Sequence, residues 1–261
     1  MNATVPAHRV FAALLKRDVR VAQRELPFFL LRTSLQPVLI TIVFGYLMPK
    51  MGFMSRDFTS AMLPGILAIS LAFSSVQSVA LPMITDFGFT REIEDRLLAP
   101  VSYKLVALEK VLNGVIQGLI AAMFVLPVAR LIMGPIDALS LTHIWSLLAV
   151  ILLSAAAFST GGLLMGTAVE GQHIGLMFGV IVAPMMMFGC AYYPWSALKV
   201  VPVMQYGVLI NPLVYVSEGM RAALTPSLPH IPLAAVLSVL ALITIFFWTL
   251  GIRSFEKRAF S

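Results

Sequence analysis

The sequence predicts an all-α integral membrane protein with six transmembrane helices. Of its 261 residues, 59% are hydrophobic and only 11% are charged, and the mean hydropathy is +0.94. Soluble domains carry about 25% charged residues, so a water-soluble fold has no room to hide this much apolar surface. Six stretches are apolar over roughly the 20 residues that a helix needs to cross a hydrocarbon core of about 30 Å. The basic residues lie between these stretches.

The apolar stretches follow one another along a single domain, residues 1–261. The fifth is the shortest. No short apolar stretch with a small-residue cleavage site opens the chain, so we expect no cleaved signal peptide. The expected spans cover residues 28–48, 60–84, 106–133, 144–169, 174–190 and 231–252.

The positions of Lys and Arg predict the orientation of these spans. If the N-terminus lies inside, thirteen of the 18 basic residues fall on the inner side. We therefore expect a multi-pass protein of a bacterial inner (plasma) membrane with both termini in the cytoplasm. The net charge of +6 follows from this placement, and it does not predict a nucleic-acid partner.

A helix at about residues 7–26 is expected to lie in the lipid headgroup plane before the first span. Its apolar and basic residues fall on opposite faces, as in interfacial helices that contact membrane lipids. The alternative is a positively charged tail that only sets the topology. The apolar face holds Phe11, Leu15, Val19, Ala22 and Leu26, and the basic face holds Arg9, Lys16, Arg20 and Arg24.

Glycines recur at four-residue spacing inside the spans, at 114/118, 162/166 and 171/175/179. Such faces let helix backbones approach closely in lipid. We expect packing within one subunit, with a dimer-forming face as the alternative. Asp86, at the inner end of the second span, is expected to be a solvated charge; the alternative is a proton relay.

The inner loop between the second and third spans predicts a short helix at about residues 90–100. Thr90 is placed to cap it, acids fill its first turn, and Pro100 ends it. Ile93, Leu97 and Leu98 form an apolar ridge suited to a groove on a soluble partner. A solvated loop is the alternative. The polar rim of this helix would comprise Arg91, Glu92, Glu94, Asp95 and Arg96.

The segment after the fifth span is apolar but interrupted by four prolines between residues 194 and 226. It also holds Lys199, Asn211, Glu218 and Arg221, which are costly in open lipid. Irregular backbone at membrane depth must be buried in protein or line water. A loop lying on the outer surface is the alternative.

Three motifs in order resemble those of type-2 ABC exporter permeases, the membrane subunits that work with separate ATPase subunits. The run REIEDRLLAPVS at 91–102 is similar to the family's acidic stretch followed by Leu-Leu-x-x-Pro. FGCAYYP at 188–194 and NPLVYVSEGMR at 211–221 resemble two motifs near the last span. The resemblance covers nearly the whole chain. Phe87, Phe89 and Arg96 depart from the family pattern.

The resemblance implies that the loop helix docks into a cleft of the ATPase subunit, which binds ATP and Mg²⁺. It further implies a second copy of the permease, re-entrant helices over about residues 191–224 that form an outer gate, and an amphipathic or lipid-linked cargo such as a drug, lipid or glycolipid. The expected gate residues are Tyr192, Tyr193, Pro194, Trp195, Asn211, Pro212, Tyr215, Glu218 and Arg221.

The chain itself carries no nucleotide-binding motif. It has no Gly-Lys pair and therefore no P-loop, and it has neither a zinc-protease helix motif nor a nucleophile elbow. We expect a permease subunit that is not an enzyme, binds no metal or cofactor of its own, and takes its energy from another polypeptide. The alternative is a secondary transporter or channel driven by an ion gradient, which would tend to place ionisable residues at mid-membrane.

Overall fold

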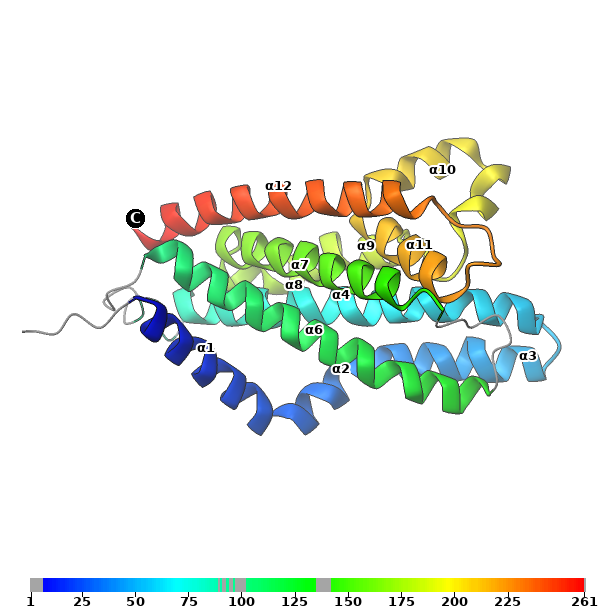
Figure 1. Cartoon of the computed structure of the whole chain (residues 1–261), viewed down its shortest axis with the longest axis horizontal. Helices are drawn as coiled ribbons and strands as arrows, with labels where there is room; N and C mark the ends of the chain where they lie inside the picture. Colours follow the sequence, from blue (N-terminus) through cyan, green and yellow to red (C-terminus); the bar gives the residue numbers. More distant parts are fainter. Residues whose placement is uncertain are drawn as a thin grey trace, which may run out of the picture.

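The computed structural model describes residues 7–88, 90, 93, 96, 102–134 and 142–260, and all regular structure in these ranges is helical. Figure 1 shows the helices as an elongated bundle. Those before the fourth span are α1 (Ala7–Arg24), α2 (Leu26–Ile40), the π-helix η1 (Thr41–Leu47), α3 (Met48–Lys50), α4 (Arg56–Gly88) and α6 (Tyr103–Met133). Those from the fourth span onward are α7 (Ile144–Ala168), η2 (Gly171–His173), α8 (Ile174–Met177), η3 (Phe178–Val182), α9 (Ala183–Met187), η4 (Trp195–Val200), α10 (Pro202–Gly207), η5 (Val208–Ile210), α11 (Pro212–Leu224) and α12 (Leu233–Ala259).

Five helical stretches in the described ranges are long and apolar enough to cross a membrane, which confirms the all-α membrane fold. They cover Leu26–Lys50, Ala61–Gly88, Tyr103–Met133, Ile144–Ala168 and Leu233–Ala259. The expected fifth span is a shorter apolar helix, Gly171–Met187. At 1.5 Å per residue it extends roughly 25 Å, less than a hydrocarbon core of about 30 Å.

The start of α1 and the end of α12 lie at the same end of the bundle (Figure 1). We call this the inner end, and the opposite end, which holds α3, α10 and α11, the outer end. The short helix ends at Met187, and the chain that follows it occupies the outer part of the bundle. There α11 packs against α4, α7 and α12, and nearly all of its side chains are buried.

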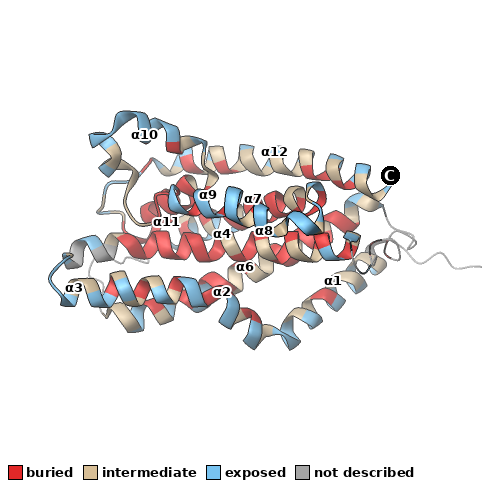
Figure 2. Ribbon diagram, turned by 180° about the vertical axis from the view of Figure 1, so that it is seen from behind, coloured by how far each residue is buried: buried red, intermediate tan, exposed pale blue. Residues whose placement is uncertain are grey.

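α4 is the central helix of the bundle, and Figure 2 shows it buried along most of its length. Its close neighbours contact it through glycine. A Cβ on Gly162 of α7 would lie 2.8 Å from the Val76 carbonyl oxygen, and one on Gly118 of α6 would lie 2.0 Å from the Ser75 hydroxyl. These approaches confirm that the glycine pairs of α6 and α7 pack within the subunit.

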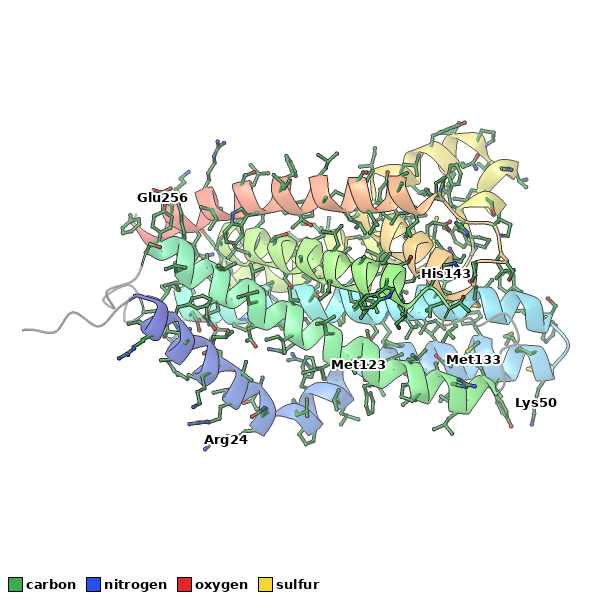
Figure 3. The ribbon with its side chains drawn as sticks, viewed as in Figure 1. Arg24, Lys50, Met123, Met133, His143 and Glu256 are labelled. Carbon is green, nitrogen blue, oxygen red and sulfur yellow. The ribbon has the colours of Figure 1, made fainter. Side chains whose placement is uncertain are left out.

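α1 runs obliquely to the bundle and meets α2 at an elbow, where Figure 3 places Arg24. The basic residues Arg9, Lys16, Arg20 and Arg24 are exposed, whereas the apolar face of α1, from Phe11 to Ala22, is half-buried. This face packs against α6. A helix is therefore present where the amphipathic pattern predicts one, and its position in the headgroup plane stays a prediction.

Candidate functional site

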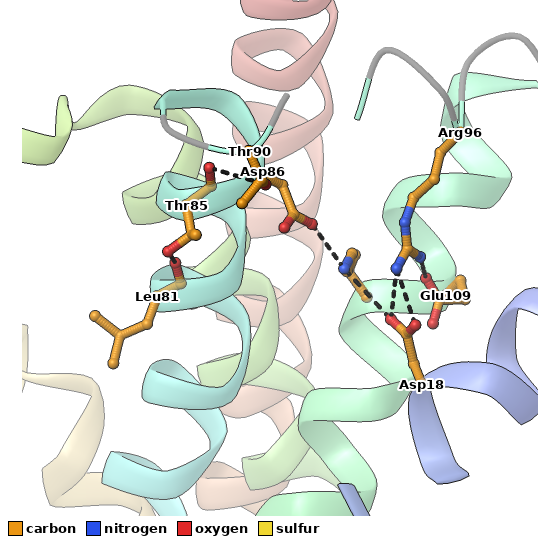
Figure 4. Close-up of polar contacts among 8 residues, drawn as sticks. Asp18, Leu81, Thr85, Asp86, Thr90, Arg96 and Glu109 are labelled. Carbon is orange, nitrogen blue, oxygen red and sulfur yellow. Dashed lines mark hydrogen bonds and ion pairs between the residues drawn. The ribbon is translucent and has the colours of Figure 1, made fainter. Parts of the chain in front are cut away.

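Five charged side chains meet at the inner end and form one ion-pair network (Figure 4). Arg96 of the inner loop pairs with Asp18 of α1 at 2.9 Å and with Glu109 of α6 at 3.1 Å. Lys110, also on α6, pairs with Asp18 at 3.3 Å and with Asp86 of α4 at 2.9 Å. None of the five is more than one-tenth exposed. The network thus joins α1, α4, α6 and the inner loop.

Both Asp18 and Arg96 are held in their charged forms. Burial raises the pKa of the Asp18 carboxyl, but Lys110 and the hydrogen bond from Arg96 outweigh burial and hold that pKa below its ordinary value. Burial lowers the pKa of the Arg96 guanidinium, but Asp18, Glu109 and Asp86 together raise it above its ordinary value. The two groups therefore form an ion pair at neutral pH.

The expectation that Asp86 is solvated among the headgroups is wrong. The residue is 7% exposed, and its carboxylate pairs with Lys110 on the neighbouring helix. Asp86 does lie near the end of α4, as its place in the sequence predicts. What decides the environment is the rotation of α4 and α6, which turns Asp86 and Lys110 toward each other.

Of the expected docking helix, the structure describes Thr90, Ile93 and Arg96. Ile93 is 2% exposed and packs with Val79, Val106 and Phe255, and Arg96 belongs to the ion-pair network. Both face their own subunit, in contrast to the expected docking ridge and solvent-facing rim. The hydroxyl of Thr90 donates to the Thr85 carbonyl at the end of α4 at 3.4 Å. Arg91, Glu92, Glu94, Asp95, Leu97, Leu98 and Pro100 lie outside the described residues.

Phe87 and Arg258 hold the inner ends of three helices together. The rings of Phe87 and Phe255 meet edge to face at 5.5 Å, and the Arg258 guanidinium lies 5.0 Å from the Phe87 ring. Arg258 also donates to the carbonyls of Gly166, Thr167 and Val169 at the end of α7. Phe87, which departs from the family pattern, thus has a packing role that joins α4 to α12.

A second network lies at the outer end around Glu218 and Arg221 of α11, which form a fully buried ion pair. Arg221 also donates to the carbonyls of Cys190, at 3.0 Å, and Ala61, at 3.3 Å. Glu218 accepts from the backbone N–H groups of Trp195, at 2.8 Å, and Ile231, at 3.0 Å. Two adjacent turns of α11 therefore fix the segments before and after it to the start of α4.

The other polar residues of the outer segment bind backbone as well. Asn211 caps α11 by accepting from the Leu213 N–H at 2.9 Å, and its amide donates to the Met185 carbonyl at 2.6 Å. The Trp195 indole donates to the Gln205 carbonyl, and the Tyr215 hydroxyl to the Leu209 carbonyl. These bonds satisfy the polar groups of an irregular chain, as its burial in protein requires.

The chain also turns sharply where it leaves the short helix. Cys190 adopts a left-handed conformation (φ 51°), which few residues other than glycine favour. Next to it, a Cβ on Gly65 of α4 would lie 1.8 Å from the Ala191 carbonyl oxygen, so only glycine lets α4 approach here. Tyr192, Tyr193 and Pro194 follow, half-buried.

Comparison with known proteins gives the family. Residues 9–225 match the family described as ABC-2 type transporter. The chain belongs to this family. Relatives in Escherichia coli K12, Escherichia coli O157:H7 and Shigella flexneri, each named inner membrane transport permease YadH, are 29% identical over 226 residues. The matches cover 82% of this chain and 84% of each relative.

Family membership makes the chain a membrane subunit of an ABC transporter, a multi-pass inner-membrane permease that is not itself an enzyme. The ABC-2 type family implies an ATPase partner in general. The match covers all five residues of the inner network and, in the outer network, both Glu218 and Arg221, whereas Ile231 lies beyond it.

The sequence reasoning missed Asp18, Glu109 and the pairing of Lys110. A signal for each is present in this ABC-2 permease. Asp18 is the single acid between residues 7 and 24, and it falls on the apolar face of that helix, one turn from Leu15. Glu109 and Lys110 stand side by side within an apolar run. An acid on an apolar face and an acid–base pair in a span both predict buried ion pairs.

Proposed function

We propose that this permease moves an amphipathic or lipid-linked molecule out of the cytoplasm or inner leaflet. A separate ATPase subunit, which binds ATP and Mg²⁺, would dock on the loop at residues 90–100 on the cytoplasmic side. Two copies of the permease would enclose the pathway. Closure of the ATPase pair would move the loops as rigid bodies and so change access to the pathway.

The observation that carries this proposal is the anchoring of the inner loop. Ile93 is buried among α4, α6 and α12, and Arg96 is ion-paired to α1 and α6. Movement of a loop held in this way is transmitted to three spans and to α1 together. A loop without contacts to the spans would not transmit its movement to them. Ile93 and Arg96 thus anchor the loop, and Leu97 and Leu98 remain the residues proposed to contact the ATPase.

The outer segment supports a gate at the far end of the pathway. Its irregular backbone is fixed at α11 by buried hydrogen bonds, while η4 and α10 are largely exposed and apolar, with Val200 at 88% and Val203 at 86% exposure. A segment that is fixed at α11 and exposes apolar side chains at η4 and α10 is suited to closing the pathway on the outer side.

The proposal is tested by replacing Leu97 and Leu98 together with Asp in the assembled transporter. We expect the ATPase subunit to be lost on purification and ATP-driven transport to be abolished, because two charges would enter an apolar docking contact. The matched control is Leu131→Asp, since Leu131 is 84% exposed at the outer end of α6. Unchanged co-purification of the ATPase with the double variant would refute the proposed docking site.

A further inference from the structure

A cleft of about 480 Å³ lies under the α1–α2 elbow, where these helices face α4 and α6. It begins beside the inner ion-pair network, since Asp18, Asp86, Arg96 and Lys110 line one side of it. From there it extends toward mid-membrane, past Gln77 of α4 and Gln117 of α6. The ion-pair network therefore forms the inner wall of a polar space within one subunit.

Two amide groups in this cleft have unsatisfied oxygens. The side-chain oxygens of Gln77 and Asn113 are buried, and neither accepts a hydrogen bond in the described part of the chain. Asn113 is only 8% exposed, and it lines the cleft. A buried polar group without a partner costs about 1–3 kcal/mol. A ligand whose hydroxyl groups donate hydrogen bonds at this depth would satisfy these amide oxygens.

Arg32 supplies a cation at the mouth of the cleft. It lies about two helical turns inside the first span, counted from Leu26. No acid pairs with it in the described part of the chain, whereas Arg96 and Lys110 are neutralised by Asp18, Asp86 and Glu109. An exposed arginine near the inner end of the first span, with no acidic partner among the described residues, is suited to a phosphate group, because its planar guanidinium matches phosphate oxygens.

An apolar pocket of about 210 Å³ adjoins the polar cleft. Both spaces share Phe29, Asn113 and Gln117, but the pocket is otherwise lined by side chains such as Leu26, Ile116 and Ile120. A polar space and an apolar space that meet at the same residues accommodate the two ends of one amphipathic molecule.

The surface beside Arg32 is apolar and uncovered. Phe28, Leu31 and Leu35 of α2 are 70%, 63% and 54% exposed. In the membrane these side chains contact acyl chains, so a molecule reaches Arg32 directly from the lipid phase without crossing water.

We propose that this cleft binds the phosphate-bearing headgroup of a membrane lipid from the inner leaflet. Arg32 binds the phosphate, Asn113 and Gln77 accept hydrogen bonds from the polar part of the headgroup, and one acyl chain enters the adjoining pocket. The inference deepens the proposed function, on which its transport role rests, by naming the class of amphiphile. Binding itself requires only the permease.

The test is native mass spectrometry of the full chain in detergent, titrated with dioleoyl phosphatidylglycerol. We expect saturable binding that Arg32→Gln weakens about tenfold, the size of one charge-assisted hydrogen bond. Asn113→Leu weakens binding less, and Arg32→Lys retains most of it. The matched control is Arg130→Gln, because Arg130 is an exposed arginine at the outer end of α6. Thermal unfolding of each variant checks that the fold is intact.

Dioleoylglycerol, which lacks the phosphate, should bind weakly, and glycerol 1-phosphate should fail to displace the lipid. Equal affinity of wild type and Arg32→Gln, or equal loss in Arg130→Gln, would overturn the assignment of Arg32. Displacement by glycerol 1-phosphate would show a site for soluble phosphate compounds instead. If the ATPase subunit still docks but no lipid binds, only this inference is refuted. If the lipid binds but the ATPase subunit does not dock, only the proposed docking site is refuted.

Discussion

Glu218 and Arg221 show what a buried charge requires in this protein. Each is fully buried, and burial of an ion pair is tolerated only when the remaining hydrogen-bonding capacity is satisfied. Glu218 accepts from two backbone N–H groups and from Arg221, while Arg221 donates to two backbone carbonyls. The pair therefore fixes backbone from three parts of the chain: the start of α4, the segment before α11 and the segment after it.

Replacing Arg221 with Met should destabilise the protein by about 3–5 kcal/mol, because Glu218 is left buried without its counter-charge. The expected result is a large fall in thermal stability in detergent and loss of transport. The double variant Glu218→Met with Arg221→Met should recover part of the stability, since no unpaired charge remains. Arg130→Met, at an exposed site, should shift stability by no more than about 0.5 kcal/mol. If the double variant were as unstable as Arg221→Met, the charge would not be the cause.

The sequence predicts that Glu218 and Arg221 are buried in protein or line water, because they are costly in lipid. It does not predict their partners. Cys190, Trp195 and Ile231 contribute backbone groups, and a backbone N–H or carbonyl has no sequence signature. The prediction that Asp86 is solvated was wrong for a related reason. Its environment depends on the relative rotation of α4 and α6, which hydropathy does not report.

Among the elements, the inner loop and α1 are coupled most directly. Arg96 links the loop to both α1 and α6, and Lys110 extends the link to α4. If the ATPase moves the loop, α1 moves with it, and so does the elbow that covers the lipid cleft. The interfacial helix is therefore expected to take part in coupling as well as in setting topology.

Replacing Arg96 with Gln should uncouple the transporter. Leu97 and Leu98 are untouched, so the ATPase subunit should still co-purify and hydrolyse ATP, while transport per ATP falls. The measurement is the ratio of transport to hydrolysis in proteoliposomes. Arg20→Gln, on the exposed face of α1, is the matched control and should leave that ratio unchanged.

Loss of stability would also lower transport, so a second variant separates the two effects. Asp18→Asn combined with Arg96→Gln removes an acid and a base together and should restore stability in part, through coupling of neighbouring sites. We expect this double variant to remain uncoupled. A normal transport-to-hydrolysis ratio in it would contradict the role of the Arg96–Asp18 link.

Hydropathy located all of the membrane elements because lipid imposes one solvent on every span. Charges and prolines in the sequence marked the inner loop at residues 90–100 and the outer segment at residues 191–224. Hydropathy placed the short fifth element at residues 174–190, and the structure has a helix of the same length at Gly171–Met187, displaced by three residues. Its middle is the π-helix η3, which hydropathy does not predict.

On the scale of the whole molecule, a pathway between two subunits requires that the subunits contact each other. One helix face is uncovered in the described part of the single subunit. The glycine pairs 114/118 and 162/166 are packed against α4, but a Cβ on Gly175 or Gly179 would meet no heavy atom of the described residues within 4 Å. Leu176 and Val180, beside them, are 62% and 63% exposed. Small residues at this spacing allow close helix contact in lipid. The short helix is therefore the surface proposed to contact the second copy.

Cross-linking tests that contact. The natural thiol is removed by Cys190→Ala, since Cys190 is the single cysteine of the chain, and Gly175→Cys or Gly179→Cys is then introduced. Mild oxidation of membranes should give a covalent dimer, because the proposed interface brings the two copies of this face together. Leu242→Cys on α12, with Leu242 66% exposed, is the matched control and should stay monomeric. Dimers at Leu242 with none at either glycine would place the interface on α12 and leave the short helix facing lipid.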